Sequence, residues 1–262
     1  KNLYSMPDAR PALKSVNLPR PVVFLHIAKT AGTSIVHFFQ RRLAANQICS
    51  HGDFLRFPAD KASFDSKLRR YQFVSGHFGY SDVASILTES YAFTFLRDPV
   101  DRVLSLYKFC MHADMQKQFA VARAARDLGL EAFLTSTRPE VSEMLDNQQT
   151  WQLARMYWHK DRQALAGISD EELLAMATTH LEEFDHVGLT ESFDSDFRRI
   201  LSDLDIDQPV PRTRQFKTID PLSRDHLSDA ALSALQDRLG LDYALLAHAK
   251  HLNSQTTAFH AN

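Results

Sequence analysis

Short apolar segments alternate with helix-like patterns along this chain. Residues 22–27 form a continuous apolar run rich in β-branched and aromatic side chains, typical of a strand buried on both faces of a parallel sheet. Residues 71–75, 91–96 and 186–190 predict three more strands, and residues 34–45 carry apolar side chains at helical spacing. The sequence therefore predicts an α/β fold with a mostly parallel central sheet flanked by helices, with ligands expected at the carboxyl ends of the strands.

The third predicted strand is followed by a long helical stretch. Asp98 is placed to cap a helix whose first turn contains Pro99. From about 111–183 the pattern stays helical, so we expect a helical insertion there that acts as a lid over one end of the sheet. Residues 225–252 predict two more helices, which separate near Gly240.

No repeat, low-complexity tract or linker divides the chain. We expect one domain over residues 21–253, a poorly ordered N-terminal leader at residues 1–20 and a C-terminal tail at residues 254–262. No run of about 18 apolar residues predicts a membrane segment, and we expect a cytoplasmic protein if the source is bacterial. The chain begins with Lys1 rather than Met, which leaves an upstream membrane anchor open.

Composition excludes several other classes of protein. The chain has 262 residues, 44% of them hydrophobic and 24% charged, which is enough to bury a full core. A net charge of −2 gives no reason to expect a nucleic-acid partner. The two cysteines, Cys49 and Cys110, form no Cys-x-x-Cys pair, and we interpret both as reduced and structural.

Glycine is scarce, so its positions are informative. The chain has 8 glycines, where average usage predicts roughly 18 at this length. Gly32 falls in the segment Leu-His-Ile-Ala-Lys-Thr-Ala-Gly-Thr-Ser of residues 25–34, in which a strand leads through a short loop into a helix. Amides at such a helix start bind phosphate, and Lys29 adds a positive charge. A Walker loop has its Lys directly after the second Gly, whereas Lys29 precedes Gly32 by three positions.

This order resembles the 5′-phosphosulfate-binding loop of sulfotransferases that use 3′-phosphoadenosine 5′-phosphosulfate (PAPS). Residues 26–34 are similar to the branch that contains the carbohydrate and heparan 2-O-sulfotransferases, sulfotransferase family 2. The family's second motif is a strand that ends in Arg and is followed by a helix with a Ser, and residues 95–107 are similar throughout. The resemblance implies a P-loop-like sheet, PAPS as co-substrate, its product 3′,5′-adenosine bisphosphate (PAP) and no required metal.

The resemblance also implies the residues that bind the nucleotide. The loop residues hold the 5′-phosphate side: Lys29, Thr30, Ala31, Gly32, Thr33 and Ser34. The 3′-phosphate is held by Arg97 and Ser105.

Weaker similarities extend over most of residues 22–250. Residues 147–150 (Asn-Gln-Gln-Thr) resemble the family's Asn-x-Gln-Thr stretch, residues 187–191 a later strand, and residues 242–249 its closing helix. Trp151 stands where Arg is common, and Leu246 where Tyr is usual.

His77 is the best candidate for the base that removes the acceptor's proton. It follows the second predicted strand, between Gly76 and Gly79, and imidazole titrates near neutral pH. A His-Gly-His stretch occupies this place in the 2-O-sulfotransferase-like branch, and Ser75 replaces its first His here. A turn histidine bonded to backbone is the structural alternative for His77, and His51 or a carboxylate is the alternative base.

The other polar candidates have weaker support. We interpret His26 as sheet core or as a group behind the site, and His248 with His251 as a solvated helix face rather than a metal site. Arg212, Arg214 and Lys217 form a basic loop between residues 212 and 217, which either closes over nucleotide or acceptor or is simply solvated.

We therefore expect an enzyme that moves a sulfuryl group from PAPS to a hydroxyl of an acceptor, a glycan or small metabolite, with carbohydrate favoured by the resemblance alone. His77 is the expected general base, and Lys29 stabilises the leaving phosphate. A P-loop-type kinase or nucleoside triphosphatase is one alternative, with Asp98 as its only obvious Mg²⁺ ligand. A non-catalytic nucleotide-binding protein is the other, and it would not need His77.

Overall fold

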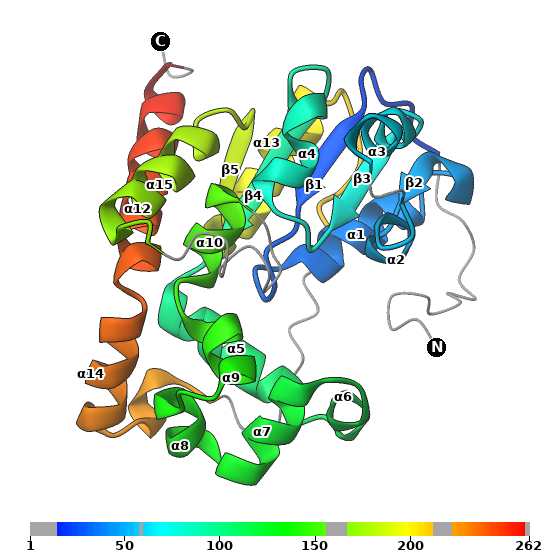
Figure 1. Ribbon diagram of the computed structural model, residues 1–262. Coiled ribbons are helices and arrows are strands. Elements are labelled where there is room, and N and C mark those ends of the chain that lie inside the picture. Colours follow the sequence, from blue (N-terminus) through cyan, green and yellow to red (C-terminus); the bar gives the residue numbers. More distant parts are fainter. Residues whose placement is uncertain (1–14, 58–59, 156–166, 212–221, 260–262) are drawn as a thin grey trace.

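A five-stranded parallel sheet forms the centre of the molecule (Figure 1). The computed structural model describes residues 15–57, 60–155, 167–211 and 222–259. The strand order is β2-β3-β1-β4-β5, and every neighbouring pair is parallel. The strands are β1 (Val22–Leu25), β2 (Ile48–Cys49), β3 (Phe73–Gly76), β4 (Tyr91–Leu96) and β5 (His186–Leu189). The predicted α/β fold with a parallel sheet is confirmed.

Helices connect the strands and cover the sheet. Those between β1 and β4 are α1 (Gly32–Gln40), α2 (His51–Phe54), α3 (Lys61–Leu68) and α4 (Tyr80–Leu87). Those between β4 and β5 are α5 (Pro99–Cys110), α6 (Ala113–Gln118), α7 (Ala120–Leu128), α8 (Leu130–Thr135), α9 (Pro139–Leu145), α10 (Gln148–Ala154) and α12 (Asp170–Leu181). Those after β5 are α13 (Phe193–Asp203), α14 (Asp229–Arg238) and α15 (Gly240–Phe259). Among the helices of the described ranges, none is long and apolar enough to cross a membrane.

Phenylalanines fill the core on one face of the sheet. Phe24 of β1 stacks on Phe93 of β4 with ring centroids 4.8 Å apart. From α1 and α13, Phe38 and Phe197 meet edge to face at 5.3 Å in the same core. Each buried aromatic ring removes a large apolar area from water, so these contacts fix α1 against the strand that precedes it.

Aliphatic side chains form the core on the opposite face. Val23 and Leu25 of β1 point into it, because successive strand residues face opposite sides. Val83 of α4, Leu153 of α10 and Leu245 of α15 pack in the same cluster. α10 is thereby held against the carboxyl half of the sheet, next to α12 and α15.

The helices α5 to α9 pack with α14 around a third core, below the sheet in Figure 1. Asp98 caps α5 as predicted, because its carboxylate accepts a hydrogen bond from the Asp101 N–H at 3.1 Å, and Pro99 occupies the first turn. The two helices predicted for residues 225–252 are α14 and α15, and α15 runs on to Phe259.

Two local features differ from the sequence prediction. The first helix ends at Gln40 instead of continuing to Ala45. Leu43, which extended the helical spacing, is buried in the phenylalanine core from the turn that follows. That turn leads to β2, an edge strand of only two residues, which is too short to produce an alternating pattern.

Candidate functional site

The loop between β1 and α1 has the backbone shape of an anion site. Lys29 and Ala31 both adopt left-handed conformations, with φ of 74° and 67°. Residues in such alternating conformations turn their N–H groups toward a common point. Among the described residues no side chain caps α1, and the Ser34 N–H donates to the Ala31 carbonyl at 3.1 Å. The amides of Gly32 and Thr33 are the ones that suit an anionic ligand.

Gly32 is required because the ring of His26 lies directly against the loop. A Cβ atom at position 32 would come within 2.1 Å of Cδ2 and Nε2 of His26. His26 is buried, and burial followed by the neighbouring His77 lowers its pKa well below the ordinary value. The neutral imidazole therefore packs directly against the loop between β1 and α1.

The loop hydroxyls point in different directions. The buried Thr30 Oγ1 donates to the Ile27 carbonyl at 2.8 Å, which closes the loop on itself. Thr33 is exposed and Ser34 is partly exposed at the start of α1. Of the three predicted hydroxyl donors, Thr33 and Ser34 are at least partly exposed, and the Thr30 hydroxyl is used within the loop.

Two cations meet beside the loop. Lys29 Nζ lies 4.5 Å from the centre of the Phe109 ring on α5, and Arg97 Nη1 donates to the Lys29 carbonyl at 3.2 Å. Burial, and then the charge of Arg97, lowers the pKa of Lys29 to about 8. Burial also lowers the pKa of Arg97. Ser105 lies on α5, partly buried. A bound anion would relieve the repulsion between these two cations.

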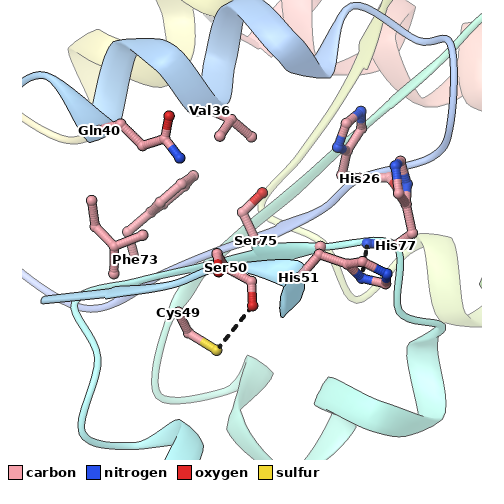
Figure 2. A pocket seen from close by; sticks show the side chains of 11 residues that line it. His26, Val36, Gln40, Cys49, Ser50, His51, Phe73, Ser75 and His77 are labelled. Atoms are coloured by element: carbon pink, nitrogen blue, oxygen red, sulfur yellow. Dashed lines mark hydrogen bonds between the residues drawn. The ribbon is translucent and has the colours of Figure 1, made fainter. Parts of the chain in front are cut away.

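His77 is held with one ring nitrogen committed to the backbone. Its Nδ1 lies 2.8 Å from the His26 carbonyl oxygen. A carbonyl only accepts, so Nδ1 carries the proton and Nε2 keeps its lone pair. The His77 N–H donates to His51 Nδ1 at 3.2 Å, and the rings of His26 and His77 are 4.3 Å apart (Figure 2). Burial, and then the neighbouring His51, lowers the pKa of His77 to about 4, so the imidazole is neutral at pH 7.

Gln149 and Gln152 of α10 brace the site, and the sequence analysis missed the second of them. Gln152 Nε2 donates to the His26 carbonyl at 3.1 Å and to the Phe78 carbonyl at 2.7 Å. Gln149 both accepts from the Arg97 N–H and donates to the Arg97 carbonyl, each at 3.0 Å. One helix thus fixes the ends of β1, β3 and β4, which precede Lys29, His77 and Arg97.

Reciprocal caps join α10 to α15. The Asn147 side chain accepts from the N–H groups of Leu241 and Asp242 at 3.0 and 3.1 Å. In return, the buried Asp242 carboxylate accepts from the N–H and the hydroxyl of Thr150, each at 2.8 Å. These bonds explain why residues 147–150 and 242 match the resemblance noted in the sequence. They orient α10, the helix that carries Gln149 and Gln152.

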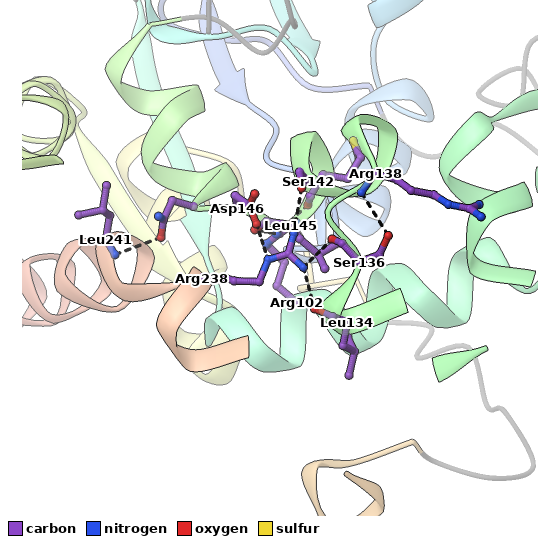
Figure 3. Close-up of polar contacts among 11 residues, drawn as sticks. Arg102, Leu134, Ser136, Arg138, Ser142, Leu145, Asp146, Arg238 and Leu241 are labelled. Carbon is purple, nitrogen blue, oxygen red and sulfur yellow. Dashed lines mark hydrogen bonds and ion pairs between the residues drawn. The ribbon is translucent and has the colours of Figure 1, made fainter. Parts of the chain in front are cut away.

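Arg238 anchors the region just before α10 (Figure 3). Its guanidinium pairs with Asp146 at 2.6 Å and donates to the carbonyls of Leu134 and Ser136 at 2.7 and 2.9 Å. Arg238 also donates to the Ser142 hydroxyl at 3.2 Å. The bonds tie α14 to α8 and α9, so the start of α10 is fixed by the helical part as well as by the sheet.

The remaining candidates lie outside this site or outside the described residues. His248 pairs with Glu182 at 2.9 Å, and no group of three metal-ligating side chains occurs among the described residues. Cys49 and Cys110 are both free and buried, and burial raises the pKa of each thiol to about 12. The basic segment with Arg212, Arg214 and Lys217 lies outside the described residues.

Fold and site together define an α/β protein with a Lys29-bearing loop at the start of its first helix and a neutral histidine, His77, close to that loop. A model of the sulfotransferase family matches residues 16–247, which is most of the chain. The protein therefore belongs to the sulfotransferase family, and the family resemblance seen in the sequence is confirmed. A comparison with curated proteins gave no match.

Proposed function

We propose that this protein transfers a sulfuryl group from PAPS to a hydroxyl of an acceptor. One observation carries the proposal: Lys29, His77 and Arg97 follow neighbouring parallel strands, next to an uncapped helix start. Paired cations and open amides suit the phosphosulfate and phosphate groups of the donor. A neutral imidazole whose Nε2 is unprotonated suits removal of a hydroxyl proton.

His77 acts as the general base. Its Nε2 accepts the hydroxyl proton as the acceptor oxygen bonds to sulfur and the bond from sulfur to the bridging phosphate oxygen breaks. The electron pair of that bond stays on the phosphate, which leaves as PAP. Burial lowers the pKa of His77 to about 4, and the negative charge of a bound donor raises it toward neutrality.

Lys29 and the start of α1 stabilise the departing phosphate. Negative charge grows on the bridging oxygen during transfer, and a preorganised cation in a site shielded from water acts strongly on it. Thr33 and Ser34 add hydroxyl donors to the loop amides. Arg97, held by Gln149 through its backbone, binds the 3′-phosphate together with Ser105.

The kinase or triphosphatase alternative has less support. It needs a carboxylate for Mg²⁺, and Asp98 was the only obvious candidate. Asp98 already accepts from the Asp101 N–H at 3.1 Å and forms an ion pair with Arg224. A carboxylate that caps a helix and pairs with an arginine favours a structural role.

The test measures PAP release from PAPS by the purified protein with a panel of n-alkanols, phenols and uronic-acid oligosaccharides. We expect turnover with at least one of these hydroxyl compounds. Replacing the base, His77→Ala, should lower kcat by roughly 10²–10⁴-fold. Lys29→Ala should lower it by roughly 10²–10³-fold. His248→Ala makes the same histidine change away from the site and should match the wild type.

Calorimetric titration with PAP separates catalysis from binding. His77→Ala should bind PAP as the wild type does, because His77 contacts the acceptor rather than the nucleotide. Full turnover in His77→Ala would refute its role as the base. PAP binding without turnover on any member of the panel would support the non-catalytic binding protein instead.

A further inference from the structure

Two residues that follow β5 contact the part of the chain that carries Arg97. β4 and β5 lie side by side in the sheet, and their pairing ends where Leu96 faces Leu189 (Figure 1). Thr190 and Glu191 come next in the chain. Both belong to the stretch that resembles the family's later strand, and neither has a role in the sulfotransfer described above.

The two peptide groups that flank Arg97 are bound at both ends by side chains. The Thr190 hydroxyl donates to the Leu96 carbonyl at 3.1 Å. The Glu191 carboxylate accepts from the Asp98 N–H at 2.9 Å. Between these two bonds, the α10 glutamine described above holds the N–H and the carbonyl of Arg97 itself. The backbone of Arg97 is therefore fixed both to α10 and to the end of β5.

Gly188 allows β5 to approach β4 closely enough for these bonds. It lies opposite Phe95 in the parallel pair. A Cβ atom at position 188 would come within 2.4 Å of Cε1 of the buried Phe95 ring. A side chain there would force the ring or β5 to move, and residues 190–191 would then lie farther from the peptides that they hold.

The side chain of Arg97 is placed from its other end as well. Its Nη1 donates to the Lys29 carbonyl at 3.2 Å, so the guanidinium lies beside the loop between β1 and α1. The backbone bonds determine where this side chain begins, and the bond to the loop determines where it ends. A guanidinium binds phosphate through planar, directional N–H groups, so a small displacement of Arg97 would weaken that binding.

We propose that Glu191 and Thr190 are positioning residues for the 3′-phosphate site: they hold Arg97 in place and so set the preference of the protein for a 3′-phosphorylated nucleotide. The inference rests on the proposed function, which places the 3′-phosphate of the donor at Arg97. Each residue acts through the backbone of Arg97. The hydrogen bond from Asp98 to Glu191 is exposed to solvent, so water can replace the carboxylate but cannot tie the peptide to β5.

The test has to separate the hydrogen bond of Glu191 from its charge. Burial lowers the pKa of Arg97, and the carboxylates of Asp101, Glu191 and Asp98 oppose that shift, so the charge of Glu191 acts at this site. A negative charge there also repels a phosphate. Glu191→Gln removes the charge and keeps an oxygen that accepts from the Asp98 N–H, whereas Glu191→Ala removes both. Comparison of these two variants isolates the hydrogen bond.

Calorimetric titration with PAP and with adenosine 5′-monophosphate (AMP), which lacks the 3′-phosphate, measures the effect. Glu191→Ala should bind PAP about fivefold more weakly than Glu191→Gln does, the usual contribution of one hydrogen bond, and the two should bind AMP equally. Thr190→Val removes the hydroxyl and keeps the shape of the side chain. It should weaken PAP binding about fivefold relative to the wild type and leave AMP binding unchanged. Asp194→Ala removes an exposed carboxylate in the first turn of α13 and should match the wild type.

The outcomes separate the positioning role from the reaction. If the wild type prefers PAP to AMP but Glu191→Ala and Glu191→Gln bind PAP equally, the role of Glu191 is wrong and the proposed function stands. Equal losses for PAP and AMP would show a general effect on the fold and would also overturn the positioning role. If the wild type binds PAP no more tightly than AMP, Arg97 holds no 3′-phosphate, and the proposed function fails together with this inference.

Discussion

Replacing Gln152 by Met should show whether Gln152 positions the catalytic base, because it removes the two hydrogen bonds that Gln152 donates beside His77. Met has a similar length and no hydrogen-bond donor, so both bonds from Nε2 are lost. The His26 carbonyl keeps its bond from His77 at 2.8 Å, whereas the Phe78 carbonyl loses its 2.7 Å bond. The Oε1 atom of Gln152 has no partner among the described residues, so its removal costs nothing.

The expected cost follows from these contacts. Leaving one buried acceptor unsatisfied costs about 1–3 kcal/mol of unfolding free energy. Each kcal/mol lowers the Tm of a domain of this size by about 2–4 °C. Because Phe78 follows His77 and the His26 carbonyl holds the His77 ring, we also expect the base to be misplaced and kcat to fall by roughly 10- to 100-fold. The KM for PAPS should stay within about twofold, since Lys29 and Arg97 keep their own contacts.

The control is a variant of the same helix that destabilises without touching His77. Leu153→Ala opens a cavity in the aliphatic core and costs about 2–5 kcal/mol. Steady-state kinetics are compared with scanning calorimetry, well below the Tm of each variant. A Gln152→Met enzyme with normal kcat, or a Leu153→Ala enzyme with an equal loss of kcat, would refute the positioning role of Gln152.

Two further predictions concern the anion loop. The affinity for PAP should fall by up to tenfold per pH unit above pH 8. Without PAP, Lys29 has its pKa lowered to about 8 and loses its proton there, whereas bound phosphate favours the protonated form. Calorimetry should show this pH dependence in the wild type and none in Lys29→Met, and equal slopes would contradict the prediction. Gly32→Ala should lower the free energy of unfolding in urea by about 1–3 kcal/mol and weaken PAP binding, because the new Cβ would lie 2.1 Å from the His26 ring. Unchanged stability and affinity would show that the ring moves aside without cost.

Much of the fold follows from local sequence patterns. The strand 91–96 was predicted at its observed limits, because all six of its residues are buried and all but Thr94 are apolar or aromatic. β2 was missed because a strand of two residues is too short to show a hydrophobic period. Its pairing with β3 depends on the rest of the sheet rather than on its own sequence. The first helix was drawn too long because Leu43 reaches the same core from a turn.

The site was only partly visible in the sequence. Lys29 and Arg97 could be found from the sequence because each belongs to a motif made of consecutive residues, 25–34 and 95–107. Gln152 is 126 residues from His26 and 74 from Phe78, so its two hydrogen bonds exist only once α10 packs beneath the sheet ends. The pairing of His51 with the His77 backbone likewise spans 26 residues and depends on the edge strand that the pattern missed.

The most direct test of sulfotransferase function compares two nucleotides in a thermal-shift experiment on the wild-type protein. PAP carries both the 5′-phosphate expected at the loop and the 3′-phosphate expected at Arg97, so it should raise the Tm. At a concentration 100 times its Kd, PAP should add about 2.7 kcal/mol to the free energy of unfolding. ADP with Mg²⁺ should have little effect. Stabilisation by ADP with Mg²⁺ and none by PAP would contradict a sulfotransferase and support a nucleoside triphosphate enzyme.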